Sequence, residues 1–310
     1  MLAVSGNSDF VQGKGRAVFC EDRGVFTVKI GIVAVRVSVF RVLNKSFGTI
    51  PQSVFWYMMF LLISVLDAFH QRTELRSNEK QTKGEQMIYK NIYEGEFVSR
   101  PNRFIARVLV DGVDTAVHVK NTGRMRELLI PGARVILNKS DNPARKTAYD
   151  LTGVYKDGKL FNIDSQAPNK VVKEWLGQQD FDLVRPEYTY GDSRVDFYME
   201  KGSDKYLMEV KGCTLEIDGI GYFPDAPTQR GVKHIRELIR AKKEGYHAAL
   251  AFVIQMEGVT EVRPNNLTMP EFGEAVEEAK QAGVDILYLQ TKVEPCRLQI
   301  SAEGKLSAYK

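Results

Sequence analysis

The sequence predicts a two-domain protein of mixed class, α+β or α/β, in which a small β-barrel precedes an α/β domain. The chain has 310 residues, of which 44% are hydrophobic and 26% charged, so it can bury the cores of two ordinary domains. Residues 87–165 hold short alternating runs separated by turn dipeptides, which is typical of β structure. Beyond residue 165, helical spacing alternates with strand-like runs. We therefore expect an extension at 1–86, a barrel at 87–165 and an α/β domain at 166–310.

The extension differs in composition from the rest of the chain. Its apolar stretch at 54–66 is about 13 residues long, whereas a membrane-spanning helix needs about 20. The stretch also begins too far from Met1 for a signal peptide. We interpret residues 1–86 as poorly structured or as a misassigned start, with Met87 opening the functional protein, and we expect no stable membrane association. A membrane-associated segment is the alternative.

The barrel is predicted from short β strands joined by tight turns. Strands are expected at 104–110, 113–119, 134–138, 152–155 and 160–163, with 97–99 leading into the first. Asp111-Gly112 and Asp157-Gly158 are the dipeptides that two-residue hairpins prefer. Five short strands in so few residues favour an oligonucleotide-binding (OB) barrel, and another small β-barrel or sandwich is the alternative.

The loop between the strands at 113–119 and 134–138 concentrates groups that bind phosphate. The predicted nucleic-acid-binding residues of this loop are Lys120, Asn121, Arg124 and Arg126. Gly123 would permit close approach of the backbone to a phosphate. His118, at the start of the loop, is expected to be structural. A solvated turn with scattered charge is the alternative interpretation.

The α/β domain is predicted from alternating helices and strands. The expected order is helix 168–178, strands 183–190, 194–199 and 205–211, helix 228–244, strand 247–256, helix 270–282 and strand 284–289. Gly245 and Gly283 stop the two longer helices. The order αβββαβ is that of the restriction-endonuclease-like, PD-(D/E)xK fold, although many α+β domains share it.

Three charged side chains of this domain are predicted to converge. Residues two apart in a strand share a face, so Glu209 and Lys211 project together. A hairpin about Gly202 then brings Asp196 opposite Met208 or Glu209. Two carboxylates beside an ammonium suit Mg²⁺ or Mn²⁺, which can activate a water for phosphodiester cleavage. We predict Asp196, Glu209 and Lys211 as catalytic, with Asp196 and Glu209 as metal ligands. An ion pair on a solvated sheet face is the alternative.

Nearby charges are weaker candidates. Glu187 is predicted as a third metal ligand, or else as a surface partner of Arg185, and Glu174 as a solvated helix charge. Arg230 and Lys233 begin a helix whose N-terminal amides favour anions, so we predict that both bind phosphate. Asp225, just before that helix, is expected to cap it rather than to approach the metal.

Four motifs resemble one known family. They are NTGRM at 121–125, YGDSRVDF at 190–197, EVKGCTL at 209–215 and FPDAPTQRGVKH at 223–234. Through them, residues 87–310 closely resemble the sugar fermentation stimulation protein family (SfsA). The resemblance implies an OB barrel, a nuclease-like domain, DNA binding without marked sequence preference and a link to regulation of maltose metabolism. Asp196, Glu209 and Lys211 occupy the motif positions that would carry a nuclease site, and residues 1–86 are not covered.

Two functions therefore stay open. The first is a metal-dependent nuclease, which the intact acidic and lysine positions favour, and the second is a non-catalytic, sequence-nonspecific DNA-binding regulator of sugar (maltose) metabolism genes. DNA is the expected partner, RNA is a further candidate, and a homo-oligomer is compatible with the sequence. The three cysteines lie far apart without a CxxC pair, which argues against a zinc cage or disulfide framework and favours the cytoplasm.

Overall fold

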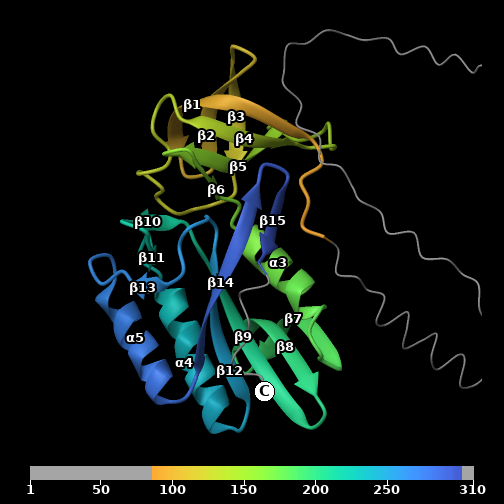
Figure 1. The fold of residues 1–310 in the computed structure, drawn as a ribbon, viewed down its shortest axis with the longest axis vertical. Helices are drawn as coiled ribbons and strands as arrows, with labels where there is room; N and C mark the ends of the chain where they lie inside the picture. Colours follow the sequence, from red (N-terminus) through yellow and green to blue (C-terminus); the bar gives the residue numbers. More distant parts are fainter. Residues whose placement is uncertain (1–85, 302–310) are drawn as a thin grey trace, which may run out of the picture. The chain divides into compact units, whose positions relative to one another are not determined.

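The computed structural model of the protein describes residues 86–301 (Figure 1). The predictions for residues 1–85, including the apolar stretch at 54–66, lie outside this range. Among the described residues, no helix combines the length and apolar character that crossing a membrane would require. Cys213 is a buried free thiol.

The first half of the described chain is an OB-like barrel. Its strands are β1 (Ile92–Asn102), β2 (Ile105–Val110), β3 (Val113–Val119), β4 (Arg134–Lys139), β5 (Tyr149–Lys156) and β6 (Lys159–Asn162). They follow the order β3-β2-β1-β4-β5-β6, and a parallel pairing of β3 with β5 closes the barrel. At both predicted hairpins the turn residues have positive φ, for example 51° at Asp111 and 78° at Gly112. The predicted barrel is confirmed.

The first barrel strand is much longer than the predicted segment at 97–99. β1 pairs with β4 through Ile92 to Glu96 and with β2 from Glu96 onward. Two register shifts, between Phe97 and Ser99 and between Ser99 and Asn102, interrupt its pairing with β2. These irregularities break the alternation of apolar and polar residues beyond Phe97, so periodicity did not extend the predicted segment past Ser99.

The second half of the described chain is an α/β domain built on a six-stranded sheet. The sheet has the order β15-β14-β12-β9-β8-β7, and β12 is parallel to both of its neighbours, β9 and β14. Its strands are β7 (Leu183–Tyr190), β8 (Ser193–Lys201), β9 (Asp204–Cys213), β12 (His247–Ile254), β14 (Asp285–Glu294) and β15 (Arg297–Ile300). The predicted αβββαβ order with its αβ extension is therefore correct, and β15 is an additional edge strand.

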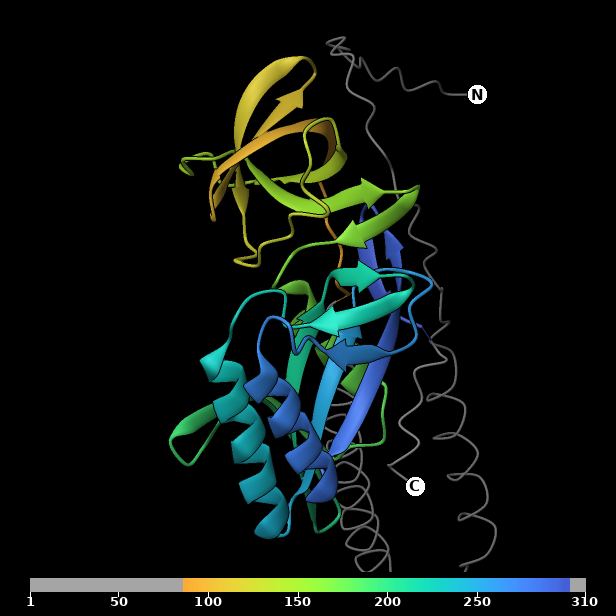
Figure 2. The same ribbon diagram turned by 90° about the vertical axis from the view of Figure 1, so that its left-hand side faces the viewer.

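Helices cover both faces of this sheet. They are α3 (Ala167–Leu176), α4 (Gln229–Lys243) and α5 (Pro270–Gln281). α4 and α5 lie side by side (Figure 2). Leu207 of β9 belongs to the apolar cluster that contains Ile235 of α4, whereas the next residue, Met208, belongs to the cluster that contains Val172 of α3. β9 is thus buried on both faces within the domain.

A small second sheet was not predicted. It has the order β10-β11-β13 and consists of β10 (Leu215–Ile217), β11 (Ile220–Phe223) and β13 (Val262–Pro264). Asp218 and Gly219 join β10 to β11 with φ values of 53° and 80°, the same turn chemistry as the barrel hairpins. The turn signal was therefore present in the sequence. The strands are only three or four residues long, too short for periodicity to reveal them.

The expectation that Glu174 is solvated is wrong. Its residue is 5% exposed, and its two carboxylate oxygens accept hydrogen bonds from the Met87 amide and the Arg297 guanidinium, each at 3.1 Å. Both donors are far from Glu174 in the chain. Helical periodicity places Glu174 on a face of α3, but it cannot show that distant segments cover that face.

Candidate functional site

Asp196, Glu209 and Lys211 are brought together at the sheet centre. The antiparallel register of β8 and β9 pairs Phe197 with Met208, so the preceding Asp196 reaches the vicinity of Glu209, as predicted. The Asp196 carboxylate accepts the Val210 amide at 2.8 Å through one oxygen and the side-chain amide of Asn169, on α3, at 2.8 Å through the other. Asp196 is therefore held by neighbours on β9 and α3.

Glu209 is almost fully buried, with 2% of its surface exposed. Its Oε1 accepts hydrogen bonds from the Lys211 ammonium, at 2.5 Å, and from Nδ1 of His234 on α4. Its Oε2 is buried and has no hydrogen-bond partner among the described residues. Burying a carboxylate oxygen that accepts no hydrogen bond is energetically unfavourable.

The surroundings push the pKa values of the two carboxyl groups in opposite directions. Burial, and then the charge of Glu209, raise the pKa of Asp196. Burial also raises the pKa of Glu209, but the hydrogen bond from His234 and the charge of Lys211 outweigh it and hold that pKa below its usual value. Glu209 is thus kept as the anion, and a neighbouring cation would favour ionisation of Asp196 as well.

The donor set fits a hard divalent cation held by few protein ligands. Carboxylate oxygens are what such cations prefer, and the partnerless Oε2 of Glu209 is one available ligand. Among the described residues, no group of three or more His, Cys, Asp or Glu side chains is placed to hold a metal ion. A cation here would therefore use Asp196 and Glu209 and keep several waters, as Mg²⁺ usually does.

His234 belongs to this site, although the sequence interpretation gave it no role. It is 9% exposed, and its second ring nitrogen, Nε2, lies 3.3 Å from Nε of Arg230, one helical turn earlier on α4. A signal existed, because residues four apart share a helix face and Arg230 was already a candidate. The partner of His234 on β9 is 25 positions away in the chain, and no local pattern points to it.

Glu187 is not brought to the carboxylates. It lies on β7 with a positive φ of 53°, and its side chain, 66% exposed, forms an ion pair with Arg194 at 3.4 Å. The sequence alternative, a surface ion pair, is therefore what the structure has, with Arg194 in place of Arg185 as the partner.

The cap of α4 is Thr228 rather than Asp225. The Thr228 hydroxyl accepts the Gly231 amide at 3.0 Å, as an N-cap side chain does. Asp225 instead accepts the Met125 amide at 3.1 Å, which links the α/β domain to the barrel loop. The expectation that Asp225 caps the helix is therefore wrong, because its partner lies 100 positions away in the chain.

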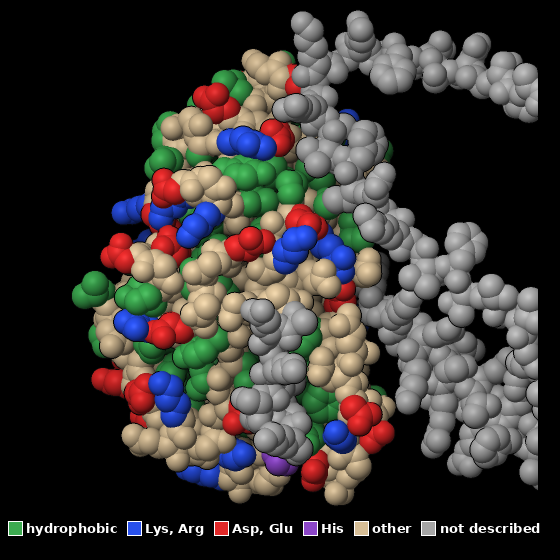
Figure 3. Space-filling view, viewed as in Figure 1, with side chains coloured by type: hydrophobic (Ala, Val, Ile, Leu, Met, Phe, Trp, Pro, Cys, Tyr) green, Lys and Arg blue, Asp and Glu red, His purple; other side chains and the backbone are tan. Residues whose placement is uncertain are grey.

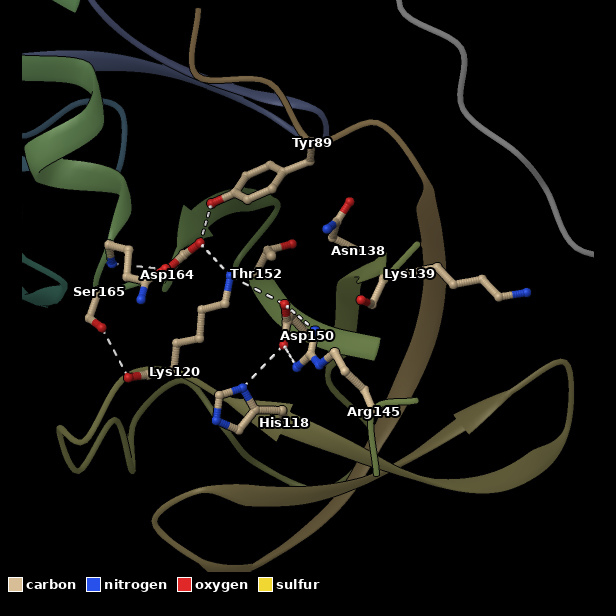
Figure 4. Close-up of polar contacts among 12 residues, drawn as sticks. Tyr89, His118, Lys120, Asn138, Lys139, Arg145, Asp150, Thr152, Asp164 and Ser165 are labelled. Atoms are coloured by element: carbon tan, nitrogen blue, oxygen red, sulfur yellow. Dashed lines mark hydrogen bonds and ion pairs between the residues drawn. The ribbon is translucent and has the colours of Figure 1, made fainter. Parts of the chain in front are cut away.

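Lys120 of the barrel loop is engaged within the protein. Its ammonium lies 3.2 Å from a carboxylate oxygen of Asp150 and 3.3 Å from one of Asp164 (Figure 4). Asp150 also pairs with Arg145 at 2.6 Å and with His118 at 3.1 Å, so His118 has the structural role expected of it. The Lys120 side chain is only 18% exposed.

The rest of the loop presents its arginines outward. Arg124 and Arg126 are exposed, while Met125 between them is buried. The guanidinium of Arg100 donates to the carbonyls of Asn121 and Gly123 at 2.8 Å each and so holds the loop backbone. The Asn121 side chain accepts the Gly123 amide at 2.8 Å, a local turn bond. Arg100 was not identified from the sequence.

Gly123 is required by close packing against Asp225. A Cβ at this position would lie 2.7 Å and 2.8 Å from the two Asp225 carboxylate oxygens. The predicted close approach at Gly123 therefore exists, but to a side chain of this protein. The loop is consequently fixed against the segment that leads into α4.

Arg230 and Lys233 are exposed at the start of α4. The Lys233 ammonium lies 3.5 Å from the Asp192 carbonyl oxygen, and Arg230 contacts His234 as described. On the face of the molecule drawn in Figure 3, Lys and Arg side chains lie interspersed with Asp and Glu, without a large patch of one sign. The visible part of that face therefore offers separate cations rather than a broad basic surface.

Comparison with known proteins identifies relatives over both domains. The family model described as the SfsA N-terminal OB domain matches residues 98–163. The model described as the sugar fermentation stimulation protein RE domain matches residues 166–297. A sugar fermentation stimulation protein homolog of Desulfitobacterium hafniense (strain DSM 10664 / DCB-2) is 52% identical over 67% of this chain and 92% of its own length. That of Clostridium beijerinckii is 51% identical over 69% and 96%.

A solved structure shares the fold. It is SfsA of Pyrococcus furiosus in complex with Ca²⁺, which matches with a TM-score of 0.61 and 26% sequence identity. The match covers 71% of this chain and 94% of that one, so it includes both the barrel and the α/β domain.

Proposed function

This chain belongs to the sugar fermentation stimulation protein family, and we propose that it binds nucleic acid and hydrolyses its phosphodiester bonds with the help of a divalent cation. The single observation that supports this most strongly is the buried site at β8 and β9. There, two carboxylates and a lysine meet, and Oε2 of Glu209 has no donor among the described residues. A protein that only binds phosphates gains nothing evident from carboxylates placed near them.

The cation would be held by Asp196 and Glu209. Mg²⁺ or Mn²⁺ is the ion we propose, and the structure of the related Pyrococcus furiosus protein in complex with Ca²⁺ supports the binding of a divalent cation. When bound, such an ion lowers the pKa of a coordinated water and offsets charge on the reacting phosphate. Asn169 and the Val210 amide orient Asp196, because each donates to one of its oxygens.

We assign Lys211 the role of a charged hydrogen-bond donor that stabilises the reacting phosphate. Its ammonium is held at 2.5 Å by Glu209 and its side chain is 14% exposed, so it is positioned rather than free to move in solvent. In hydrolysis, a water oxygen bonds to phosphorus while the bond from phosphorus to the leaving sugar oxygen breaks. Lys211 would donate a hydrogen bond to the phosphoryl oxygens as negative charge builds on them.

The exposed cations are the proposed phosphate contacts. Arg124 and Arg126 come from the barrel loop, and Arg230 and Lys233 from the start of α4. The Asp225 bond to Met125 holds the two segments to one another, so a strand could contact both at once. Phosphate contacts of this kind position a strand without reading its sequence. We therefore propose DNA, and secondarily RNA, as the ligand, bound without marked sequence preference.

The full-length chain should be incubated with labelled single- and double-stranded DNA and RNA, with Mg²⁺, with Mn²⁺ and with EDTA. We expect cleavage that requires the cation, that Asp196→Ala abolishes and that Lys211→Ala reduces by about 10²–10³-fold, while binding persists. Glu187→Ala is the matched control, because its carboxylate pairs with Arg194 away from the site and should leave cleavage unchanged. Binding without cleavage of any substrate would contradict the nuclease and leave a DNA-binding regulator.

A further inference from the structure

His234 makes two contacts that together define which of its nitrogens carries a proton. A guanidinium has only donors, so the contact from Arg230 Nε at 3.3 Å makes Nε2 of His234 an acceptor. The proton of the neutral ring then lies on Nδ1, which faces Oε1 of Glu209. His234 therefore donates to Glu209, and Arg230 holds the ring in that tautomer.

The two carboxylate oxygens of Glu209 consequently differ in their hydrogen-bond partners. Oε1 accepts from both His234 and Lys211, whereas Oε2 is buried without a partner among the described residues. Nothing in β9 itself distinguishes them, because Lys211 alone could follow either oxygen as the carboxylate rotates. The rigid ring from α4, 9% exposed, is what fixes the rotation.

We propose that His234 is a positioning residue that holds Oε1 of Glu209 and thereby reserves Oε2 for the divalent cation, an inference that rests on the proposed function. Arg230 extends this arrangement, because its Nε contacts the ring while the residue itself is exposed at the start of α4, where we place a phosphate contact. One helix would thus both contact the nucleic acid and set the orientation of a metal ligand. Mutation of a residue that hydrogen-bonds to a metal ligand and orients it commonly lowers metal affinity by about 10–100-fold.

Calorimetric titration of the full-length chain with Ca²⁺ alone tests the inference without any cleavage. We expect His234→Ala to weaken Ca²⁺ binding by about 10–100-fold. His234→Asn should largely retain affinity, because its side-chain amide can still donate near the Nδ1 position. His247→Asn is the matched control, since His247 is exposed on β12 and stacks on Tyr206. Ca²⁺ binding by His234→Ala as tight as in the wild type would overturn the inference.

Nitrogen NMR of the wild-type imidazoles gives an independent measurement that does not require any variant to bind metal. We expect His234 to be the Nδ1-protonated tautomer, with its signals assigned by their loss in His234→Asn. An Nε2-protonated ring would overturn the inference. A wild-type chain that binds no Ca²⁺ would overturn both the proposed cation site and this role of His234, whereas tight binding by wild type and His234→Ala alike would overturn the role of His234 alone.

Discussion

Two clusters in this protein have the same ingredients, a pair of acidic side chains and a lysine, but differ in how their carboxylates are satisfied. In the barrel, Lys120 bridges Asp150 and Asp164, and each acid has further donors, Arg145 for Asp150 and the Tyr89 hydroxyl, at 3.1 Å, for Asp164. At the sheet centre, by contrast, Oε2 of Glu209 lacks a donor among the described residues.

The difference indicates which cluster stabilises the fold and which is open to a ligand. A buried charge network whose members are all paired rigidifies the structure and has no vacant group to offer. A buried anion with an unused oxygen costs stability and is retained where a cation or substrate can supply the missing partner. Residue type alone does not separate the two cases, since both clusters contain the same kinds of side chain.

The largest expected effect is on stability, in the barrel cluster. Asp150→Ala removes the partner shared by Lys120, Arg145 and His118 and leaves two partly buried cations, Lys120 and Arg145, without it, so it should lower the free energy of unfolding by about 3–5 kcal/mol. Glu209→Gln should lower it by less than Asp150→Ala does, because glutamine keeps an oxygen that can accept from Lys211 and His234 and replaces the partnerless oxygen with an amide nitrogen. Urea unfolding measures both. Equal losses in the two variants would erase the contrast between the clusters.

The next effect is on chemistry, at the sheet centre. Lys211→Ala should reduce cation-dependent cleavage by about 10²–10³-fold, the usual effect of losing one donor to developing charge. Single-turnover cleavage of labelled DNA with Mn²⁺ measures this. Glu187→Ala serves again as the control, and Lys211→Arg shows whether any cation at this position is sufficient. A cleavage rate unchanged in Lys211→Ala would remove the reason to assign this lysine to the reaction.

Low pH should destabilise the barrel cluster through protonation of Asp150. Burial raises the pKa of this carboxyl, but the hydrogen bond from Arg145 and the charge of Lys120 outweigh it and lower that pKa to about 2. An unfolded aspartate has a pKa of about 3.9, so the folded state is favoured above that pH and loses this stabilisation as the pH falls toward 2. The loss should be roughly 2 kcal/mol.

Urea unfolding at pH values between 5 and about 2 measures that loss. Asp150→Asn is the matched variant, because it cannot lose a charge at this position. The difference in stability between wild type and Asp150→Asn should shrink as the pH falls. A difference that stays constant across the range would show that Asp150 does not carry this pH dependence.

The smallest effect is on nucleic-acid affinity and compares two cations of one loop. Arg124→Ala should weaken DNA binding to a similar degree for all sequences and reduce the slope of log affinity against log salt by about 0.9. Lys120→Met should instead destabilise the barrel, because its ammonium lies between two buried carboxylates. Fluorescence anisotropy over a salt series, with unfolding measured in parallel, separates the two outcomes. A reduced salt slope in folded Lys120→Met would place Lys120 among the phosphate contacts.

The sequence itself was sufficient to predict the structural features that depend only on residues close together in the chain. The dipeptide Asp111-Gly112 predicted a hairpin because few residues tolerate positive φ. Alternation in β9 placed Glu209 and Lys211 on one face, because side chains two apart in a strand project together. The order of helices and strands, and the motifs that cover both domains, followed from the same local regularities.

Only the tertiary structure decided which side chains find a partner among residues that are distant in the chain. Lys120 and Arg124 look alike in the sequence, but the first meets Asp164 and the second remains exposed. His234 acquires its place at the site because α4 packs against β9, and Asp225 finds its partner in the barrel. Local patterns determine where a backbone bends and which face a side chain takes. Whether a polar group is left without a partner depends on which remote segments pack against it, because hydrogen bonds act over a few ångströms of space and not along the chain.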